Sequence, residues 1–388
     1  MTKFVKGLEL CESFFNEYGL PVIQRNYPNI SFSAGLLGWG SDVLGYDNPV
    51  STDHMWGPRF YLFLKDCDIH IKDDLMDLFG KNLPYTYKGF SVNFSTPNPN
   101  GNGVRHAEFI NSGHVSPLIE IYTINEFINK YLGMMPVNDL EWLSVSEHRL
   151  LGFTSGKLFI DMLNISEIRN KLLFYPRDVK LYLIASQWSV IAEEQAFVKR
   201  CSDRGDDLGS RIICSRIAER LMRLCFLYEG KYAPYSKWFG TGFRQLTVDG
   251  KIYDEIEAAI SANTTQEREK HILEAKVLVA ALHNASCLTE PLEIHVQKYY
   301  GRDIGVIFAD KFAEKTKDMI FNPVLKECPL IGSLSQIGNF AEISDNPLLQ
   351  DNVQRLYLRH NRKNSQSNRF SPGLRQNPDT LPGSSPGG

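Results

Sequence analysis

Long apolar runs are missing from this sequence of 388 residues, and no uninterrupted apolar stretch approaches the 18 residues that a membrane-spanning helix needs. The first eight residues, Met-Thr-Lys-Phe-Val-Lys-Gly-Leu, also lack the apolar core of a secretory signal peptide. We therefore expect no membrane association and a cytoplasmic location.

The sequence has no large excess of positive or negative charge, and it has few cysteines. The formal net charge is only -3, so the overall composition gives no reason to expect general nucleic-acid binding. The seven cysteines are odd in number and none are spaced as Cys-x-x-Cys, which argues against a zinc ribbon or a disulfide framework. We expect them to be reduced thiols in a cytosol.

Apolar and charged residues are present in the proportions of a globular protein, at 43% hydrophobic and 22% charged. The length suggests about two to three domains. Strand-like runs are confined to the first part of the chain, and long patterns of helical period to the second. This distribution predicts an α+β protein with a mixed β-sheet domain over 1–161, an all-α domain over 162–350 and a disordered polar tail over 359–388.

The stretch 31–65 is the most informative one. A short apolar segment ends in Gly-Trp-Gly-Ser at 38–41, and after an eleven-residue spacer Asp53 opens another apolar run. The pattern predicts a strand, a tight glycine turn, a spacer and a second strand. Glycine lets backbone N–H groups approach a triphosphate, and the hydroxyl of Ser41 adds a donor.

A second segment carries one carboxylate in the middle of a β-branched run. Residues 117–123 have the pattern of a strand with Glu120 near its centre, and a helical pattern follows and ends at Gly133. An isolated glutamate on an edge strand faces solvent in most proteins, so Glu120 by itself is a weak signal of function.

Three segments of the second half carry charged residues in helical or turn contexts. Glu193 and Glu194 come near the end of a helix predicted over 176–201. Arg211 follows the loop Gly-Asp-Asp-Leu-Gly-Ser and opens a long helix, and Lys237 lies in an aromatic turn at 232–242. A solvated helix face or an interhelical ion pair explains such charges as well as function does.

Several short segments together resemble a mainly bacterial family of unknown function in the nucleotidyltransferase (polymerase-beta-like) superfamily. They are Trp-Gly-Pro-Arg at 56–59, Tyr-Pro-Arg-Asp-Val at 175–179, the loop at 205–210, Leu-Met-Arg-Leu-Cys-Phe-Leu at 221–227 and Tyr-Ala-Pro-Tyr-Ser-Lys-Trp-Phe-Gly-Thr at 232–241. The resemblance covers nearly the whole chain except the tail, and the last segment is its most specific part. It implies a nucleotidyltransferase-like sheet domain followed by a helical domain.

The resemblance also implies a role for each candidate residue. Gly40 and Ser41 would cradle the β- and γ-phosphates of a nucleoside triphosphate. Asp53 and Glu120 would hold Mg²⁺. Glu120, or Glu194 in the helical domain, would serve as the base for an attacking hydroxyl. By the same analogy Lys237 and Arg211 would contact phosphate.

Met55 departs from the pattern that the resemblance implies, because its position often holds a second acidic residue. The spacer carboxylates Asp42 and Asp47 could supply the missing ligand.

Three functions therefore stay open. The first is Mg²⁺-dependent transfer of a nucleoside monophosphate to an unknown hydroxyl on a small molecule, a tRNA end or a protein. The others are a degenerate site that binds nucleotide or partner without turnover, and an interaction module in which the aromatic turn only packs helices.

Overall fold

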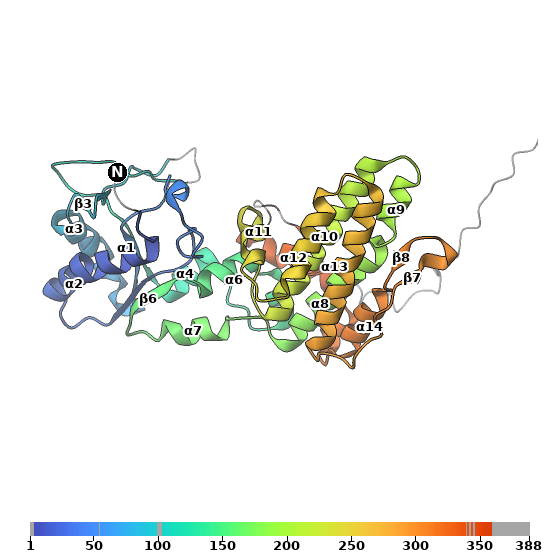
Figure 1. Ribbon diagram of the computed structural model, residues 1–388. Helices are drawn as coiled ribbons and strands as arrows, with labels where there is room; N and C mark the ends of the chain where they lie inside the picture. Colours follow the sequence, from blue (N-terminus) through green and yellow to red (C-terminus); the bar gives the residue numbers. More distant parts are fainter. Residues whose placement is uncertain are drawn as a thin grey trace, which may run out of the picture.

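A sheet part and a helical part lie side by side along the long axis of the molecule (Figure 1). The computed structural model describes residues 4–53, 55–98, 103–338, 340, 343 and 346–358. The tail predicted over 359–388 lies outside these residues. Every helix within them is too short or too polar to cross a lipid bilayer. All seven cysteines are described, and each is a free thiol.

Four strands form one mixed sheet in the order β5-β2-β1-β6. They are β1 (Phe32–Leu36), β2 (Arg59–Leu64), β5 (Leu118–Thr123) and β6 (Lys157–Asp161). Strand β1 pairs antiparallel with β2 and with β6, whereas β2 pairs parallel with β5. The sheet predicted from the 31–65 stretch is therefore confirmed, and the α+β class with it.

The two faces of the sheet are covered by different helices, because alternate residues of a strand point to opposite sides. On one face Phe60 and Leu62 pack with residues of α1 (Gly7–Phe14) and α3 (Lys72–Asn82). On the other face Tyr61 and Phe63 pack with Phe127 of α4 (Ile124–Tyr131). All six residues of β2 are buried, as expected for a strand covered on both sides.

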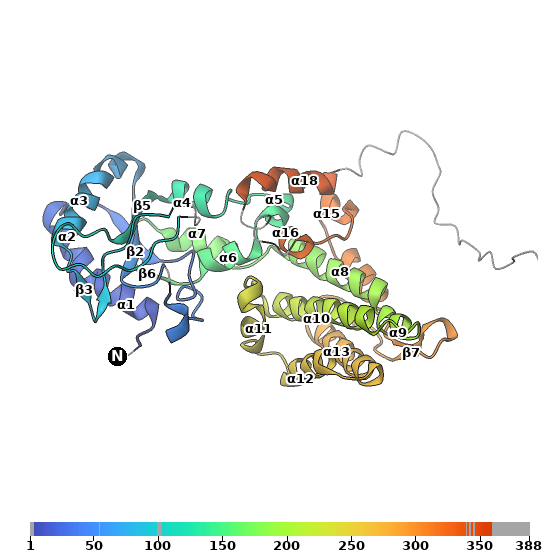
Figure 2. The ribbon, with the colours of Figure 1, turned by 90° about the horizontal axis from the view of Figure 1, so that it is seen from above.

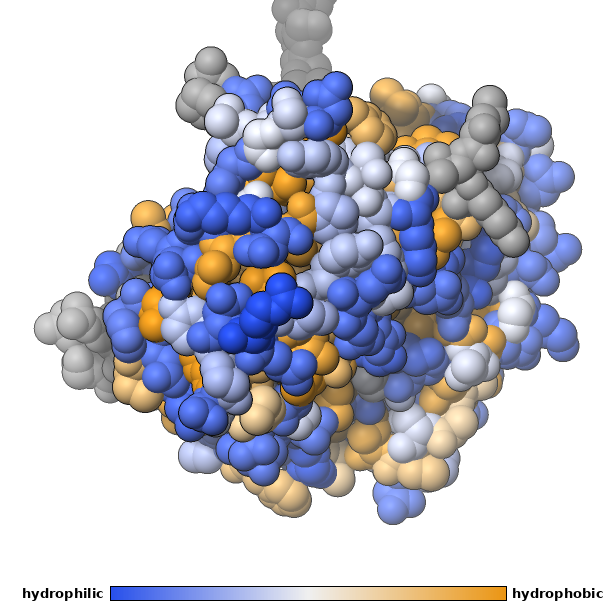
Figure 3. Space-filling view, turned by 90° about the vertical axis from the view of Figure 1, so that its left-hand side faces the viewer, coloured by the Kyte–Doolittle hydropathy of each residue, from blue (hydrophilic) through white to orange (hydrophobic). Residues whose placement is uncertain are grey.

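The remaining elements of the first half are short. They are the π-helical turn Phe15–Gly19, α2 (Leu20–Asn26), the 3-10 turns Pro49–Ser51 and Asp66–Ile71, β3 (Thr86–Tyr87), β4 (Phe90–Ser91), α5 (Asp139–Ser144), α6 (Glu147–Thr154) and α7 (Ile165–Lys171). Helix α5 precedes β6 in the sequence but packs against α8 and α18 of the helical part. The outer end of the sheet part presents a largely hydrophilic surface with scattered apolar residues (Figure 3).

The helical part is built on three long helices that pack along one another. Its elements are α8 (Arg177–Glu194), α9 (Phe197–Ser202), α10 (Asp207–Glu229), α11 (Ser236–Arg244), α12 (Gly250–Ser261), α13 (Thr265–Ala285), β7 (Gln297–Lys298), the 3-10 turn Tyr299–Gly301, β8 (Gly305–Val306), α14 (Asp310–Asp318), α15 (Pro323–Glu327), α16 (Leu334–Ile337), the 3-10 turn Pro347–Leu349 and α18 (Gln350–Leu358). This part is largely helical, as predicted, and the short β7–β8 pair is an addition to it. Figures 1 and 2 both show α11 at the end of the helical part nearest the sheet.

A polar network lies inside the core where α8, α10 and α13 meet. The indole of Trp188 donates to the hydroxyl of Tyr228 at 2.8 Å, and that hydroxyl lies 2.9 Å from Nδ1 of His283. The other ring nitrogen of His283 lies 3.0 Å from the hydroxyl of Thr289. His283 is fully buried, and burial lowers its pKa to about 4. The imidazole is therefore neutral, and the network is complete in that state.

Candidate functional site

A cavity of about 670 Å³ opens between the sheet and α11, and we call it the main cavity. Of the seven residues that the sequence predicted for the site, five line it: Gly40, Ser41, Asp53, Glu120 and Lys237. Its other described lining residues include two buried aromatics, two exposed aromatics and further charges, namely Trp56, Tyr61, Trp39, Tyr235, Asp42, Arg59, Arg105 and Lys130. The structure thus gathers residues that are up to about two hundred positions apart in the chain.

The glycine turn at the start of the cavity is built over a buried ion pair. Gly40 has φ +126, and a Cβ atom at this position would collide with Asp42 Oδ1 and Arg59 Nη2. Arg59 Nη2 donates to Asp42 Oδ1 at 2.8 Å and to the carbonyl of Trp39 at 3.0 Å. Burial by itself would lower the pKa of Arg59, but the charge of Asp42 raises that pKa above its ordinary value. Only glycine fits at position 40.

The two spacer carboxylates have structural partners. Asp42 belongs to the ion pair with Arg59. Asp47 is buried and accepts a hydrogen bond from the backbone N–H of Gly7 at 2.7 Å and another from the indole of Trp56 at 3.4 Å. It therefore fixes the start of α1. Asp47 does not line the main cavity, whereas Asp42 does, and its Oδ2 is buried without a hydrogen-bond partner among the described residues.

Asp53 does not open a strand, which corrects the sequence expectation. It is exposed in the loop before β2, and the strand begins only at Arg59. Met55, two residues later, has φ +50, and its sulfur lies 3.4 Å from the backbone N–H of Arg105. The 3-10 turn Pro49–Ser51 and the bends at 55 and 57–58 occupy the stretch before β2, so the strand begins later than the pattern predicts. Asp53 and Glu120 therefore line one cavity without sharing neighbouring strands.

Glu120 lies where predicted, near the middle of β5 and opposite Tyr61 of β2. Its carboxylate accepts a hydrogen bond from the hydroxyl of Tyr122 and pairs with the ammonium of Lys130 at 3.1 Å. The side chains of Glu120 and Lys130 are 31% and 51% exposed, so this ion pair contributes at most about 1 kcal/mol. Glu120 is held in place weakly and remains open to another cation.

The donor set for a metal ion is small. Among the described residues, no group of three or more histidine, cysteine, aspartate or glutamate side chains could hold a metal. Mg²⁺ prefers octahedral oxygen coordination and often takes one or two carboxylates together with substrate phosphates. Asp53 and Glu120 therefore do not form a complete Mg²⁺ site by themselves. They fit only a Mg²⁺ ion that brings phosphate oxygens with it.

The aromatic turn at 232–241 faces the main cavity, and its residues divide between core and lining. Tyr232 is buried and donates to the carbonyl of Leu172 at 2.9 Å. The ring of Trp238 packs against Tyr46 of the sheet part, with 5.4 Å between the ring centroids. Tyr235 is 39% exposed and lines the cavity. Lys237, beside it, is exposed at the cavity wall.

Arg211 and Glu194 lie elsewhere, which corrects two further expectations. Arg211 is in the first turns of α10, where it pairs with Asp207 and donates to the carbonyl of Ala262. Glu194 ends α8 and pairs with Arg216 of α10. Arg211 precedes Arg223, which lines a smaller hollow beside the main cavity, by twelve residues, or about 18 Å along a helix. Neither residue lines the main cavity or this smaller hollow, because each belongs to the far end of the bundle.

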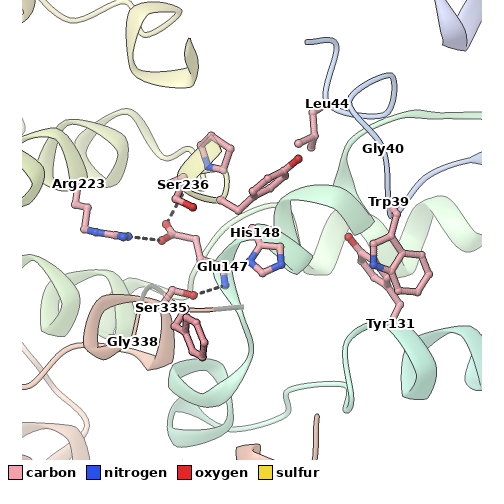
Figure 4. Close-up of a pocket in the computed structure, with 15 residues that line it drawn as sticks. Trp39, Gly40, Leu44, Tyr131, Glu147, His148, Arg223, Ser236, Ser335 and Gly338 are labelled. Atoms are coloured by element: carbon pink, nitrogen blue, oxygen red, sulfur yellow. Dashed lines mark hydrogen bonds and ion pairs between the residues drawn. The ribbon is translucent and has the colours of Figure 1, made fainter. Parts of the chain in front are cut away.

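A second, smaller hollow of about 240 Å³ adjoins the main cavity, and we call it the side pocket. The two share Trp39, Gly40 and Tyr235. Its deep wall is the buried Glu147 of α6, whose carboxylate accepts from the backbone N–H of Ala233 at 3.1 Å and pairs with Arg223 at 3.4 Å (Figure 4). Burial raises the pKa of Glu147, and Arg223 opposes the shift. Glu147 thereby ties the aromatic turn to α6 and α10.

Several lining residues were missed by the sequence reasoning. Arg59 stands in the Trp-Gly-Pro-Arg segment that carried the resemblance, so that segment contained a signal. Arg105 follows a loop rich in glycine and asparagine and donates to the carbonyls of Ser95 and Pro117 at 2.7 and 3.1 Å. Lys130 is one of several lysines on exposed helix faces. Nothing in the sequence sets Arg105 or Lys130 apart, because the fold alone brings them to the cavity.

Comparison with known proteins finds a family that is similar to part of the chain. Residues 142–239, from the end of α5 into α11, match the family described as a domain of unknown function (DUF4037). No protein of curated function matches the sequence. The structure is similar to the crystal structure of a nucleotidyltransferase-like protein from Exiguobacterium sibiricum, with 11% identity and a TM-score of 0.31 over 76% of this chain and 82% of that chain.

Proposed function

We propose that this chain binds a nucleoside triphosphate in the main cavity. The observation that carries the proposal is the meeting of the Gly40-Ser41 turn with Lys237 across that cavity. The turn offers backbone donors at one wall, and the helical part brings a cation to the other. A cytoplasmic location, where nucleoside triphosphates are abundant, fits the seven free thiols and belongs to the same proposal.

The backbone of the glycine turn supplies donors for phosphate oxygens. Among the described residues, the N–H groups of Gly40, Ser41 and Asp42 donate no hydrogen bond to the protein, whereas the following amides close the turn. The amide of Leu44 donates to Gly40, and that of Tyr46 to Ser41. Backbone N–H groups left open beside a cavity favour an anion. The φ of Gly40 is what leaves them open.

The charges around the main cavity favour an anion as well. Asp42 is neutralised by Arg59, and Glu120 by Lys130. Arg105 donates to carbonyls and to a serine hydroxyl, so no carboxylate balances its charge among its described hydrogen-bond partners. The described lining residues thus carry one more cation than carboxylates, although the chain as a whole is acidic. A triphosphate gains from this local excess.

Replacing Lys237 by alanine is expected to weaken the binding of ATP by about tenfold, because one charge-assisted contact to phosphate contributes roughly 1.5–3 kcal/mol at most and the lysine is exposed. Isothermal titration of the full chain with ATP measures the change. The matched control is Lys231→Ala, which removes an exposed lysine that pairs with Glu229 and lines neither hollow. Equal affinity of the Lys237 variant and the wild type would show that the turn only packs helices.

Transfer of a nucleoside monophosphate to a hydroxyl is a second candidate, and the observation that favours it is that Asp53 and Glu120 line the same cavity. When bound, Mg²⁺ held by these carboxylates and by phosphate oxygens would neutralise charge that develops on the leaving pyrophosphate. In the alternative role, with Mg²⁺ held by Asp53 and phosphate oxygens, Glu120 released from Lys130 would take the proton of the acceptor hydroxyl. The hydroxyl oxygen would then bond to the α-phosphorus as the bond to the leaving pyrophosphate breaks. The adjoining side pocket would receive that acceptor, whether a small molecule, a tRNA end or a protein side chain.

Pyrophosphate release separates the two candidates. Incubation with each labelled triphosphate, Mg²⁺ and a cell extract supports transfer when pyrophosphate appears and label enters an acceptor fraction. Saturable binding without pyrophosphate release supports the first candidate, which Met55 and the Glu120–Lys130 pair favour.

A further inference from the structure

We infer that the base of the bound nucleotide stacks on Trp39 and Tyr235, at the junction of the main cavity and the side pocket. The inference rests on the proposed nucleotide binding. It gives a position to the base, which the proposed phosphate contacts do not place. Both rings line both hollows, and they are 40% and 39% exposed. The other aromatics of the main cavity, Trp56 and Tyr61, are only 5% and 4% exposed, so they offer no open ring face.

Both rings are already held in place without a ligand. Trp39 meets Tyr131 edge to face, with 4.4 Å between the ring centroids, and Tyr131 is itself buried (Figure 4). On the helical side, the hydroxyl of Tyr235 accepts a hydrogen bond from the indole of Trp238 at 2.9 Å. Aromatic surfaces fixed before binding lose little conformational entropy when a planar ligand stacks on them.

The position of the two rings matches the order of groups in a nucleotide. Trp39 adjoins Gly40, whose amide donates no hydrogen bond among the described residues, and Tyr235 precedes Lys237 by two residues. A base at the junction therefore places its phosphates in the main cavity, between the glycine turn and the lysine. It also leaves the interior of the side pocket, lined by Glu147, His148 and Ser236, beyond the base.

Stacking on two aromatic side chains has a consequence for specificity. Every nucleobase has an aromatic face, so stacking tolerates a change of base, whereas hydrogen bonds to base edges do not. We therefore expect ATP, GTP, CTP and UTP to bind with affinities that differ by less than about tenfold, and purines to bind best because their rings are larger.

The test compares ATP with inorganic tripolyphosphate, which carries the same chain of phosphates and no base. The wild type is expected to bind ATP at least about tenfold more tightly. Tyr235→Ala should weaken ATP by about tenfold and leave tripolyphosphate unchanged, while Tyr235→Phe, which keeps the ring, should retain most of the ATP affinity. Trp39→Ala is expected to act like Tyr235→Ala, and circular dichroism of each variant checks that it is folded.

Each outcome decides something. Equal affinity of the wild type for ATP and tripolyphosphate overturns the stacking site and leaves the phosphate site standing. The stacking site is also overturned if Tyr235→Ala weakens the binding of ATP and of tripolyphosphate by the same factor, since the ring would then act on the phosphates or on the fold. Failure of the wild type to bind either ligand overturns the proposed function, and the stacking site with it.

Discussion

Gly40→Ala is expected to lower the free energy of unfolding by about 3–5 kcal/mol and to abolish the binding of ATP. The added methyl group would occupy the place of the Asp42–Arg59 contact. Both side chains are at least nine-tenths buried, and breaking a buried ion pair leaves an uncompensated charge in the core, at a cost of about 3–5 kcal/mol. The backbone adds to the loss, because φ +126 is a conformation that alanine rarely adopts.

Urea denaturation of the wild type and of Gly40→Ala measures this loss of unfolding free energy, and Gly45→Ala is the matched control. Gly45 lies in the same turn with φ +75, but a Cβ atom there would meet nothing within 4 Å. That variant should therefore lose only about 1–2 kcal/mol, from backbone strain alone. Losses of equal size for the two variants would mean that the ion pair under Gly40 is not what requires glycine.

Lowering the pH from 6.5 to about 4 is expected to remove about 3 kcal/mol of unfolding free energy through His283 alone. Burial lowers the pKa of this histidine to about 4, whereas an unfolded chain has a histidine pKa near 6.5. Above pH 6.5 neither state binds the proton, so the contribution of His283 to stability is fully present. Between these two pKa values only the unfolded state binds it, and stability falls.

Burial causes this shift, and the hydrogen bonds around His283 are complete when the ring is neutral. A proton added to Nδ1 would face the hydroxyl of Tyr228, which already accepts the indole N–H of Trp188. Urea denaturation at pH 7 and pH 4.5 should show a smaller difference for His283→Gln than for the wild type. The exposed His295 is the comparison, and His295→Gln should leave the pH dependence as it is. A pH dependence unchanged in His283→Gln would show that other groups cause the acid sensitivity.

The sheet was predictable from the sequence because its signals are local. The strand at 32–36 is mostly apolar and leads into a glycine turn, and residues 60–64 of the next strand form a continuous apolar run. Such a run predicts a strand that is buried on both faces. The segment around Glu120 was equally clear, since the capping threonine and glutamate that follow it mark the start of α4. Helix and strand identity therefore depended on neighbours in the sequence.

The position of the candidate residues was less predictable, because it depends on loops and on long-range packing. The pattern placed Asp53 on a strand, but the turn that follows Asn48 and the left-handed backbone at Met55 keep it in a loop. Arg211 and Glu194 were chosen by analogy from helices of the correct composition. Tertiary packing decides which end of a helix faces a cavity, and the periodicity of a single helix does not predict this.

Hydrogen–deuterium exchange with and without ATP tests nucleotide binding in the main cavity most directly. The amides of Gly40, Ser41 and Asp42 donate no hydrogen bond within the described protein, so they should exchange fast in the free chain and slowly once they bind phosphate. We predict that ATP slows exchange in 38–45 and in 235–241 together, and leaves the far end of α10 unchanged. Unchanged exchange in both segments at saturating ATP, or protection confined to another part of the chain, would contradict the account.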